Sequence, residues 1–514
     1  MAWNTADSNA TMCRTTRRRF IAGISASLVP IVRGSRAAEH DGFEAVRQHI
    51  SRLVASEEAT GIAVAVTQNG RITWEEGFGW ADQAAGRKVT SRTPFCLASI
   101  TKPFTTTVLT TLAAEGKLSL DEPGGRYLGK RAPRGPNGDP AGTTIRRLGA
   151  HAGGLPTIFE MFFPDHGPAA PSADALLRGY GALAFPPGEM YEYSNVGYAM
   201  LGKIAEQVSG REFGPLMTER ILHPLGMQDS FFGTDKDRLP TRALCYEAAG
   251  KALPYYTTAT PPSGELFVSA HDLARFALFN LPSRSRGDRA ILDDRWLAQA
   301  HKPVFAGPEG TLTTFGWFRG RTKSGLEVLI KTGGQVGVAT ILYMIPSLDM
   351  ACLVLTNRSD NTHVVHDVAG KILRTLTPTW DSPTTTPAPA STTFATRPEY
   401  AGRWEGRLMN DGADMHAVLD IVADGSHTLS IGDGAPEPIR DLQLQGTALI
   451  GSTTGKIDSA EAIRTAATNL EIKLIAHAGK LVGRVIASAE KPGTMLPYVL
   501  SLSQQQLPPI RQGK

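Results

Sequence analysis

Cysteine is scarce in this chain of 514 residues. Its four cysteines, at positions 13, 96, 245 and 352, form no Cys-x-x-Cys pair and no Cys/His ligand spacing. Zinc sites and disulfide scaffolds need such spacing or density, so we expect no metal, no cofactor and no disulfide framework. Hydrophobic residues make up 41% and charged residues 20%, which excludes a wholly disordered, collagenous or multi-spanning membrane chain.

A clustered basic surface is also missing from the body of the chain. The formal net charge is +4, but residues 1–37 carry six arginines and one aspartate. Without that segment the net charge falls to −1. Because nucleic-acid binding requires a clustered basic face on the folded body, the sequence predicts no nucleic-acid partner.

Residues 1–37 are typical of a bacterial export signal of the twin-arginine type. An arginine triplet at residues 17–19 precedes a weakly apolar run over residues 20–32, and small residues suited to cleavage lead to Ala38. The run is shorter than the roughly 18–20 residues of a spanning helix, so we expect no stable membrane span. The alternative is a basic tail without structure. The export interpretation predicts a periplasmic or secreted protein.

The composition changes at a Pro- and Thr-rich segment, residues 377–395, which is typical of a solvated linker. Residues 38–376 before it mix the period of strands with the period of helices. Residues 396–514 after it contain about eight short alternating runs separated by Gly, Asp and Pro, which predict a small antiparallel β-barrel. The sequence therefore predicts a signal segment, a mixed domain, a linker and an all-β domain.

The mixed domain has strand patterns near both of its ends and helical patterns between them. The predicted strands cover residues 62–66, 71–74, 326–331, 339–344 and 350–355. The predicted helices cover residues 100–112, 196–208 and 364–376. An Asn69-Gly70 turn joins the first two strands as a hairpin. This order predicts one antiparallel sheet built from both ends of the domain, with a helical lobe packed against it.

Ser99 and Lys102 are three residues apart at the start of a predicted helix. This spacing places both side chains on one face, and Pro103 is tolerated only in a first helical turn. The N–H groups there favour developing negative charge, and a desolvated, neutral lysine can accept the serine proton. The spacing alone is a weak signal, because Ser488 and Lys491 share it in an expected surface turn.

Two further motifs follow in order along the chain. Tyr193-Ser194-Asn195 begins the next predicted helix, and Lys331-Thr332-Gly333-Gly334 ends a predicted strand. Taken singly, they indicate a buried helix cap and a surface lysine. Together with Ser99 and Lys102 they supply the side chains and backbone N–H groups that acyl transfer requires.

On these motifs, residues 60–376 resemble the serine β-lactamase and penicillin-binding-protein superfamily. The resemblance lies in the class C-like branch, with D-aminopeptidases, DD-peptidases and family VIII-type esterases. Further stretches in the family's order are Phe95-Cys96-Leu97-Ala98, His151-Ala152-Gly153-Gly154-Leu155-Pro156, Pro224-Leu225-Gly226-Met227 and Ser269-Ala270-His271-Asp272. The implied architecture is an α/β (α+β) β-lactamase/transpeptidase-like fold of two lobes with an antiparallel sheet and the site at their junction.

The resemblance also implies roles for the motif residues. Ser99 would be the acyl-accepting nucleophile, Lys102 its proton partner, and Tyr193 a proton relay with a depressed phenol pKa. Asn195, Lys331 and Thr332 would bind substrate, and the N–H groups of Ser99 and Gly334 would form the oxyanion hole. Whether Lys102 or Tyr193 is the acylation base stays open. His151 is expected to support loop structure.

The implied function is an exported serine hydrolase that cleaves a small amide, β-lactam or peptide-like substrate through a Ser99 acyl-enzyme. The retained Lys331 favours a carboxylate near the scissile bond. The alternatives are a carboxylesterase of the same family and a non-catalytic ligand sensor or scaffold. The expected partner is the small-molecule or peptide-like substrate, and the oligomeric state is left open.

The C-terminal domain resembles the lipocalin-like barrel modules that some of these enzymes carry. The resemblance rests on Tyr400-Ala401-Gly402-Arg403-Trp404. Two roles are open for such a module. It would either wall off the cleft and narrow the substrate range, or serve only for stability or docking.

Overall fold

The computed structural model describes residues 42–505, apart from residues 166, 384–391, 394–399, 411, 423–424 and 490–492. The expected export signal therefore lies outside the described residues, as do most of the expected linker and Lys491. Contacts unite the chain from Gly42 onward into one unit. The four-part domain division stays a prediction.

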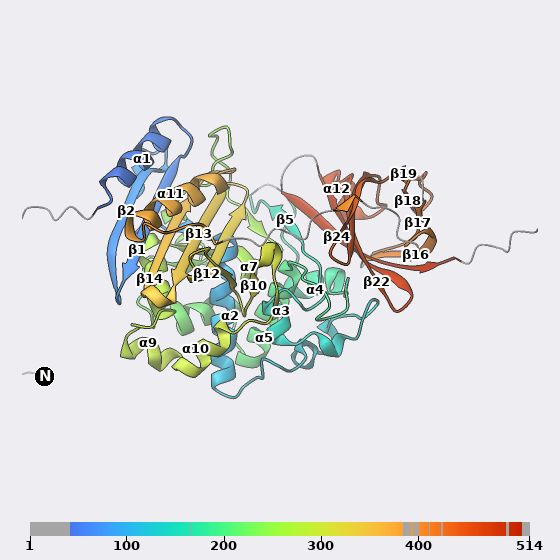
Figure 1. Cartoon of the computed structure of the whole chain (residues 1–514), viewed down its shortest axis with the longest axis horizontal. Helices are drawn as coiled ribbons and strands as arrows, with labels where there is room; N and C mark the ends of the chain where they lie inside the picture. The colour runs from blue at the N-terminus through green and yellow to red at the C-terminus, as the bar shows by residue number, and fades with distance from the viewer. Residues whose placement is uncertain are drawn as a thin grey trace, which may run out of the picture. The chain divides into compact units, whose positions relative to one another are not determined.

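A nine-stranded antiparallel sheet dominates the described part of residues 42–376 (Figure 1). Its strands are β1 (Gly61–Gln68), β2 (Arg71–Asp82), β3 (Arg87–Lys88), β9 (Phe305–Ala306), β10 (Leu312–Thr313), β11 (Phe318–Arg321), β12 (Glu327–Gln335), β13 (Val338–Ile345) and β14 (Met350–Thr356). Their spatial order is β3-β2-β1-β14-β13-β12-β11-β10-β9. Since β1 pairs with β14, the two ends of the domain meet in one sheet, which confirms the sequence prediction.

Both faces of the central strands β1, β13 and β14 are buried, since alternate residues of a strand point to opposite sides and nearly all residues of these three strands are buried. On β1, Ile62, Val64 and Val66 pack with the helices α1 (Glu44–Ala55) and α11 (Thr362–Leu376). Figure 1 shows both helices on the same face of the sheet. Ala63 and Ala65 belong to the larger core on the other face, where α8 (Ala270–Phe279) contacts β1 and β14.

Local turn and cap signals end the elements where the sequence predicts. Asn69 (φ 50°) and Gly70 (φ 76°) both have positive φ, as a primed hairpin turn requires. The helix α2 (Thr101–Ala114) is followed by Gly116 (φ 71°), and Gly210 (φ 71°) ends α5 (Asn195–Ser209) in the left-handed region. Glycine adopts this region without a steric penalty.

The helical lobe packs around α2 and α5. Its other helices are α3 (Ile145–Gly149), α4 (Ala173–Tyr180), α6 (Phe213–Met217), α7 (Pro261–Gly264), α9 (Arg286–Ile291) and α10 (Asp294–His301). A small sheet of β4 (Phe95–Cys96), β8 (Leu266–Val268) and β6 (Phe231–Phe232) leads into the start of α2. Phe104 of α2 stacks on Phe276 of α8, with ring centroids 3.6 Å apart, which ties the helices behind the sheet together.

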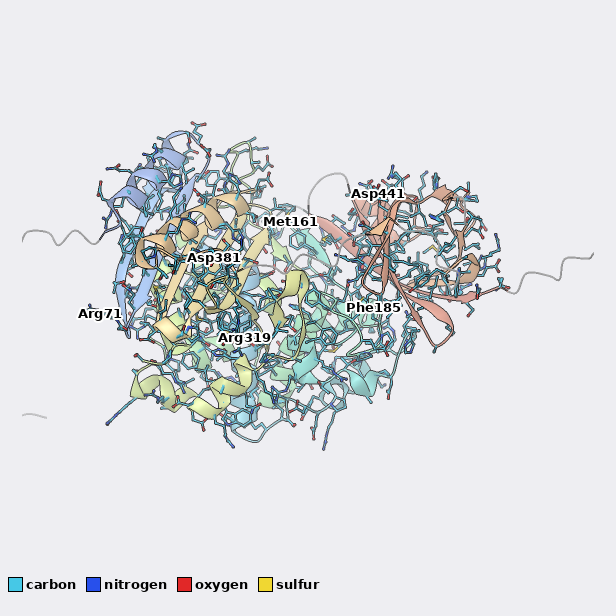
Figure 2. The ribbon with its side chains drawn as sticks, in the orientation of Figure 1. Arg71, Met161, Phe185, Arg319, Asp381 and Asp441 are labelled. Carbon is cyan, nitrogen blue, oxygen red and sulfur yellow. The ribbon has the colours of Figure 1, made fainter. Side chains whose placement is uncertain are left out.

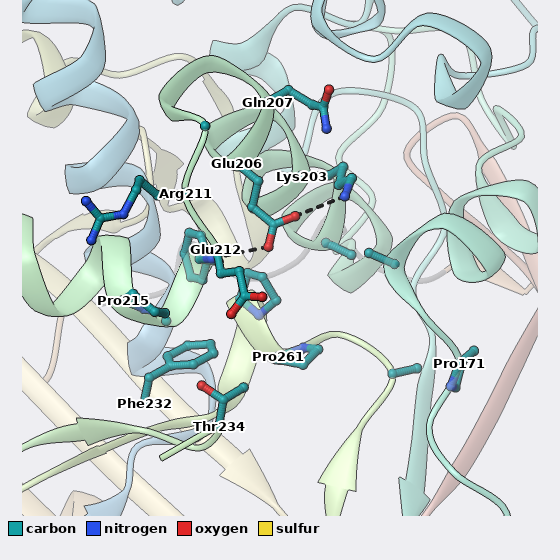
Figure 3. A pocket seen from close by; sticks show the side chains of 18 residues that line it. Pro171, Lys203, Glu206, Gln207, Arg211, Glu212, Pro215, Phe232, Thr234 and Pro261 are labelled. Atoms are coloured by element: carbon teal, nitrogen blue, oxygen red, sulfur yellow. Dashed lines mark hydrogen bonds and ion pairs between the residues drawn. The ribbon is translucent and has the colours of Figure 1, made fainter.

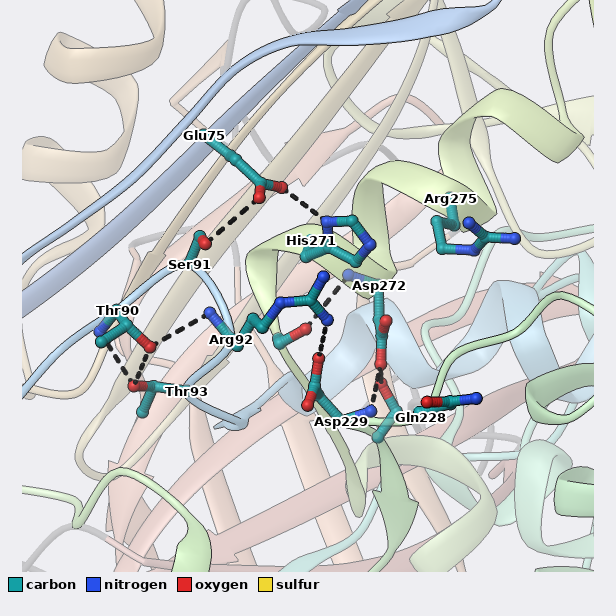
Figure 4. Close-up of polar contacts among 12 residues, drawn as sticks. Glu75, Thr90, Ser91, Arg92, Thr93, Gln228, Asp229, His271, Asp272 and Arg275 are labelled. Atoms are coloured by element: carbon teal, nitrogen blue, oxygen red, sulfur yellow. Dashed lines mark hydrogen bonds and ion pairs between the residues drawn. The ribbon is translucent and has the colours of Figure 1, made fainter. Parts of the chain in front are cut away.

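The stretch that contains His271 and Asp272 connects α8 to neighbouring elements through polar contacts (Figure 4). Ser269 caps α8 by accepting a hydrogen bond from the backbone N–H of Asp272. Asp272 Oδ2 accepts from the backbone N–H of Asp229 and from Ser230 Oγ, while His271 Nδ1 lies 2.7 Å from a carboxylate oxygen of Glu75 on β2. These contacts fix α8 between the sheet and the helical lobe.

The described residues after 400 form a nearly closed barrel of nine antiparallel strands. They are β16 (Gly402–Asn410), β17 (Ala413–Ile421), β18 (Thr428–Ile431), β19 (Glu437–Pro438), β20 (Arg440–Gln445), β21 (Ala448–Thr454), β22 (Asn469–His477), β23 (Lys480–Ser488) and β24 (Thr494–Gln504). One short helix, α12 (Ala460–Thr465), interrupts them. The expected barrel is confirmed, with β19 as the strand that the sequence did not predict.

The barrel packs against the helical lobe instead of standing apart from it. Strand β5 (Phe159–Phe162) pairs with β24 of the barrel. Phe185, labelled in Figure 2, shares a buried apolar cluster with Val482 and Val499. Asn137 Nδ2 donates to the backbone oxygen of Leu500 at 3.0 Å. Strand pairing, apolar burial and a buried hydrogen bond thus join the two.

Candidate active site

Ser99 lies in a tight turn immediately before α2. We call residues 97–100 the nucleophile turn. Ala98, just before Ser99, has φ 46°, a conformation that costs free energy in a non-glycine residue and occurs often at functional sites. The turn is held by hydrogen bonds from Leu97 N to the Leu266 oxygen and from Thr340 Oγ1 to the Leu97 oxygen, both 2.9 Å. The serine side chain is partly exposed at this rigid position.

Lys102 is completely buried, and its amine points at Ser99. Nζ lies 3.1 Å from Ser99 Oγ, 2.8 Å from Asn195 Oδ1 and 3.0 Å from the backbone oxygen of Ser263. Burial, reinforced by the nearby Lys331 charge, holds the pKa of Lys102 well below its usual value. A neutral amine donates two hydrogens, which the Asn195 and Ser263 oxygens accept. Its lone pair is then left for the Ser99 proton.

Tyr193 contacts the same serine from the other side. Its Oη donates a hydrogen bond of 2.7 Å to Ser99 Oγ. The expectation of a depressed phenol pKa is wrong, because burial raises the pKa of Tyr193 above its usual value. The Nζ atoms of Lys102 and Lys331 do lie 4.8 and 5.7 Å from the centroid of the phenol ring. Burial also lowers the pKa of both lysines, however, so neither acts as a full positive charge on the phenol. The phenol is therefore a protonated donor at neutral pH.

Lys331 is almost completely buried on β12, at 1% exposure. Its Nζ lies 4.8 Å from the ring centroid of Phe318 on the neighbouring strand β11. Burial lowers the pKa of Lys331 to about 7. The adjacent Thr332 is half-buried. Near neutral pH, the Lys331 side chain is therefore divided between its charged and its neutral form.

The two glycines after Thr332 have different surroundings. A Cβ on Gly333 would collide with the Leu97 carbonyl oxygen and Thr340 Oγ1. A Cβ on Gly334 would meet nothing within 4 Å, and the residue is exposed. Gly333 thus allows β12 to lie directly against the nucleophile turn, while Gly334 borders open space beside it, as the expected oxyanion hole requires.

Asn195 is held within the site by two partners. Its Oδ1 accepts from Lys102, and its Nδ2 donates to the Ile158 oxygen at 2.9 Å. The side chain therefore orients the Lys102 amine directly. Its expected contact with the substrate amide stays a prediction.

His151 supports Tyr193, a contact that the sequence does not reveal. The imidazole stacks on the phenol ring with centroids 4.3 Å apart. Burial, followed by the charges of Lys331 and Lys102, keeps the pKa of His151 well below its usual value. Its Nδ1 accepts a hydrogen bond of 3.1 Å from the backbone N–H of Ser194, so the neutral ring carries its proton on Nε2. This geometry fits the expected structural role.

Two further groups of the site were not predicted from the sequence. The Ser263 carbonyl is an acceptor for Lys102, and Phe318 faces Lys331. The Pro261-Pro262-Ser263-Gly264 sequence, which folds into the single-turn helix α7, gave no indication of the first. No local pattern marks the second, since Phe318 reaches Lys331 only through the pairing of β11 with β12.

A separate cavity of about 670 Å³ lies beside the end of α5 and the start of α6 (Figure 3). Glu206 accepts hydrogen bonds there from Lys203 Nζ and the backbone N–H of Phe213. Pro261 and Pro262 line one wall, whereas Ser99 is not among the lining residues. The described residues contain no cluster of three or more His, Cys, Asp or Glu side chains placed to hold a metal ion.

Comparison with known proteins identifies the family and the fold. The family model described as Beta-lactamase matches residues 46–376. The chain belongs to the beta-lactamase family. This family of serine hydrolases is the one that the motifs indicated, so the family assignment and the expected fold are confirmed.

The similar curated proteins are distant. Protein flp of Staphylococcus aureus (strain MRSA252) is 24% identical over 306 residues, which are 58% of this chain and 59% of flp. The chain thus spans less than two thirds of that relative's length. A beta-lactamase of Pseudomonas fluorescens is 30% identical over 209 residues, 40% of this chain and 56% of that protein.

Solved structures show the same fold at low identity. SurE superposes with a TM-score of 0.63 at 21% identity and covers 90% of this chain and 99% of its own. A class C beta-lactamase superposes with a TM-score of 0.56 at 20% identity, over 68% of this chain and 99% of its own. No helix among the described residues combines the length and apolarity needed to cross a membrane.

Proposed function

We propose that this protein is a serine hydrolase that cleaves a small amide, β-lactam or peptide-like substrate through an acyl-enzyme on Ser99. The observation that carries the proposal is the position of Ser99 Oγ between two proton-handling groups. Lys102 Nζ lies 3.1 Å from it on one side, and Tyr193 Oη lies 2.7 Å from it on the other. The lowered pKa of Lys102 and the raised pKa of Tyr193 suit a base and an acid.

The acylation step follows from these protonation states. Ser99 Oγ attacks the acyl carbon and transfers its proton to neutral Lys102. The developing oxyanion accepts hydrogen bonds from the N–H groups of Ser99 and Gly334. Tyr193 donates its phenol proton to the leaving nitrogen and is reprotonated from Lys102, so Lys102 ends neutral. In deacylation the same groups take the proton of water and return it to Ser99. General acid–base groups of this kind each contribute roughly 10²- to 10⁴-fold.

Lys331 favours a substrate with a carboxylate near the scissile bond. When protonated, it offers a buried cation beside Tyr193, and such a charge binds a carboxylate strongly. A solved structure with this fold is titled a D-stereospecific amidohydrolase from Streptomyces sp., and another a D-alanine carboxypeptidase from Burkholderia cenocepacia. Both titles are in line with an amide substrate.

A carboxylesterase is the second candidate. The pKa of Lys331 is lowered to about 7, so a large part of the enzyme at neutral pH has an uncharged group there. An uncharged ester suits that form. Turnover of neutral esters alone would favour this candidate over an amidase.

A substrate panel beside a Ser99→Ala control tests the proposal. The panel contains nitrocefin, p-nitrophenyl esters and D-amino-acid anilides, and intact-mass analysis follows labelling by a fluorophosphonate. We expect one adduct on Ser99 and turnover of at least one substrate, both abolished in Ser99→Ala. Labelling that persists in Ser99→Ala would refute the nucleophile. A chain with neither an adduct nor turnover would be the ligand sensor or scaffold instead.

We also propose export through the twin-arginine route to the periplasm or the cell exterior, with a mature chain that starts near Ala38. The arginine triplet at residues 17–19 supports it. Replacing all three with lysine should retain the protein in the cytoplasm. Unchanged recovery outside the cytoplasm would refute this route.

A further inference from the structure

The residue before the tyrosine of the site, Glu192, is bound by the barrel. Its carboxylate is only 4% exposed. Oε1 accepts a hydrogen bond of 2.6 Å from Arg484 Nε, and Oε2 accepts one of 2.7 Å from Lys473 Nζ. Both cations belong to the barrel, on β23 and β22. The barrel therefore reaches the chain position next to Tyr193 through two charged contacts.

The two barrel cations need a carboxylate between them. Lys473 and Arg484 are directly opposite each other on paired strands, and like charges in that position repel. Their side chains are only 16% and 9% exposed, so water screens them little. Glu471 binds Arg484 Nη2 at 2.7 Å, which leaves Glu192 to neutralise Lys473 and share Arg484. Burial alone would raise the pKa of Glu192, but these two charges outweigh it and hold that pKa below its usual value.

The barrel and His151 also form hydrogen bonds with the backbone on both sides of Tyr193. Lys473 Nζ also donates to the Tyr191 oxygen at 3.1 Å. From the opposite side, His151 accepts hydrogen bonds from the N–H of Glu192 at its carbonyl oxygen, 2.9 Å, and from the N–H of Ser194 at Nδ1. The segment 191–194 is thus held between the barrel and His151, and we call this set of contacts the clamp. Tyr193 projects from the segment toward Ser99.

We propose that the barrel is part of the catalytic unit, with Arg484 and Lys473 acting through Glu192 as positioning residues for Tyr193. This inference rests on the proposed function, because it needs a reaction in which Tyr193 takes part. It gives the barrel a role that neither a wall of the cleft nor a docking module describes. A displacement of about 1 Å in a group that handles protons costs up to 10²-fold in rate, so a loosened clamp has a measurable effect.

Single substitutions in the full-length protein test the clamp. The readout is the second-order rate constant for fluorophosphonate labelling of Ser99, which needs no known substrate. We expect Arg484→Met to lower it roughly tenfold or more. Arg407→Met is the matched control. Arg407 lies on β16, is exposed, and pairs with Asp414, which also belongs to the barrel domain. The control should leave the rate unchanged. The strand pairing of β5 with β24 and the buried apolar cluster remain to hold the barrel in place.

A double-mutant cycle separates positioning from general destabilisation. In a Tyr193→Phe background, Arg484→Met should have no further effect, because the group that it positions is already gone. A merely structural role would lower the rate by the same factor in both backgrounds. Should Arg484→Met fail to fold, Glu192→Gln provides the same cycle, since it removes the charge and keeps the shape.

The outcomes distinguish this inference from the proposed function. A wild-type chain that is not labelled at Ser99 would refute the proposed function. Labelling with a rate that Tyr193→Phe leaves unchanged would show that the phenol does not assist the attack of Ser99, and it would overturn the clamp as a device that acts on this step. Labelling that Tyr193→Phe slows, but that Arg484→Met and Glu192→Gln leave at the wild-type rate, would overturn the clamp alone.

Discussion

The titration of Lys331 predicts that substrate preference depends on pH. Burial lowers the pKa of this lysine to about 7. Below that pH the buried ammonium is charged and attracts a substrate carboxylate; above it the amine is neutral and the attraction is lost. For a single group with this pKa, the protonated fraction falls from about 90% at pH 6 to about 10% at pH 8. Binding that depends on the charge therefore weakens roughly tenfold over this range.

A pair of esters measures this effect without interference from Lys102. One is a p-nitrophenyl hemiester of a dicarboxylic acid, and the other is its neutral methyl ester with the same leaving group. Both require neutral Lys102, so the ratio of their kcat/KM values cancels that titration. Because kcat/KM reports the pKa values of the free enzyme, kcat/KM for the hemiester divided by kcat/KM for the methyl ester should fall about tenfold between pH 6 and pH 8.

Lys331→Arg is the control, since an arginine stays charged across this range. Its substrate ratio should be independent of pH if the side chain fits the site. In the wild type, a ratio that does not change between pH 6 and pH 8 would refute the carboxylate-binding role of Lys331. A ratio that rises with pH would refute that role as well, because an ammonium attracts a carboxylate and cannot produce this trend.

Three further predictions concern the site and its support. Lys102→Met and Tyr193→Phe should each lower turnover roughly 10²-fold or more with an unchanged circular dichroism spectrum, and wild-type turnover in either variant would remove that residue from the mechanism. Gly333→Ala should lower the melting temperature because its Cβ collides with the nucleophile turn, whereas Gly334→Ala should not; equal melting temperatures would contradict this packing. Limited proteolysis should cut first in the expected linker at residues 377–395, and the two fragments should still co-elute on gel filtration because β5 pairs with β24.

The sequence predicted the elements whose signals are local. The Asn69-Gly70 hairpin turn and the glycine that ends α5 have the expected positions, because each depends on φ values that few residues tolerate. The barrel strand β19 (Glu437–Pro438) was missed, since two residues that include a proline carry no strand pattern. The helix α1 was not anticipated either, although Val46, Ile50 and Leu53 form its buried face.

The site was predictable in composition and not in electrostatics. The order of the motifs predicted that Ser99, Lys102, Tyr193 and Lys331 belong to one site. The fold places these four side chains close together. The phenol pKa was expected to fall because two lysines were counted as full charges. Burial acts on all three groups at once, however, and it lowers the pKa of each lysine while it raises that of the phenol. A spacing rule carries no information about burial, so it cannot give the sign of such a shift.

The same limit explains why Glu192 escaped notice in the sequence. An acidic residue between two tyrosines is ordinary on a solvated surface, and its partners Lys473 and Arg484 lie more than 280 positions further along the chain. Only the docking of the barrel turns that carboxylate into a buried group with two cations. An uncompensated buried charge costs several kcal/mol, so the barrel and the Tyr193 segment stabilise each other through this contact. The stabilisation is present at neutral pH and is lost as the pH falls through the lowered pKa of Glu192. If the clamp acts on Tyr193, acid should therefore slow Ser99 labelling in part through this carboxylate, and Glu192→Gln should remove that part of the pH dependence.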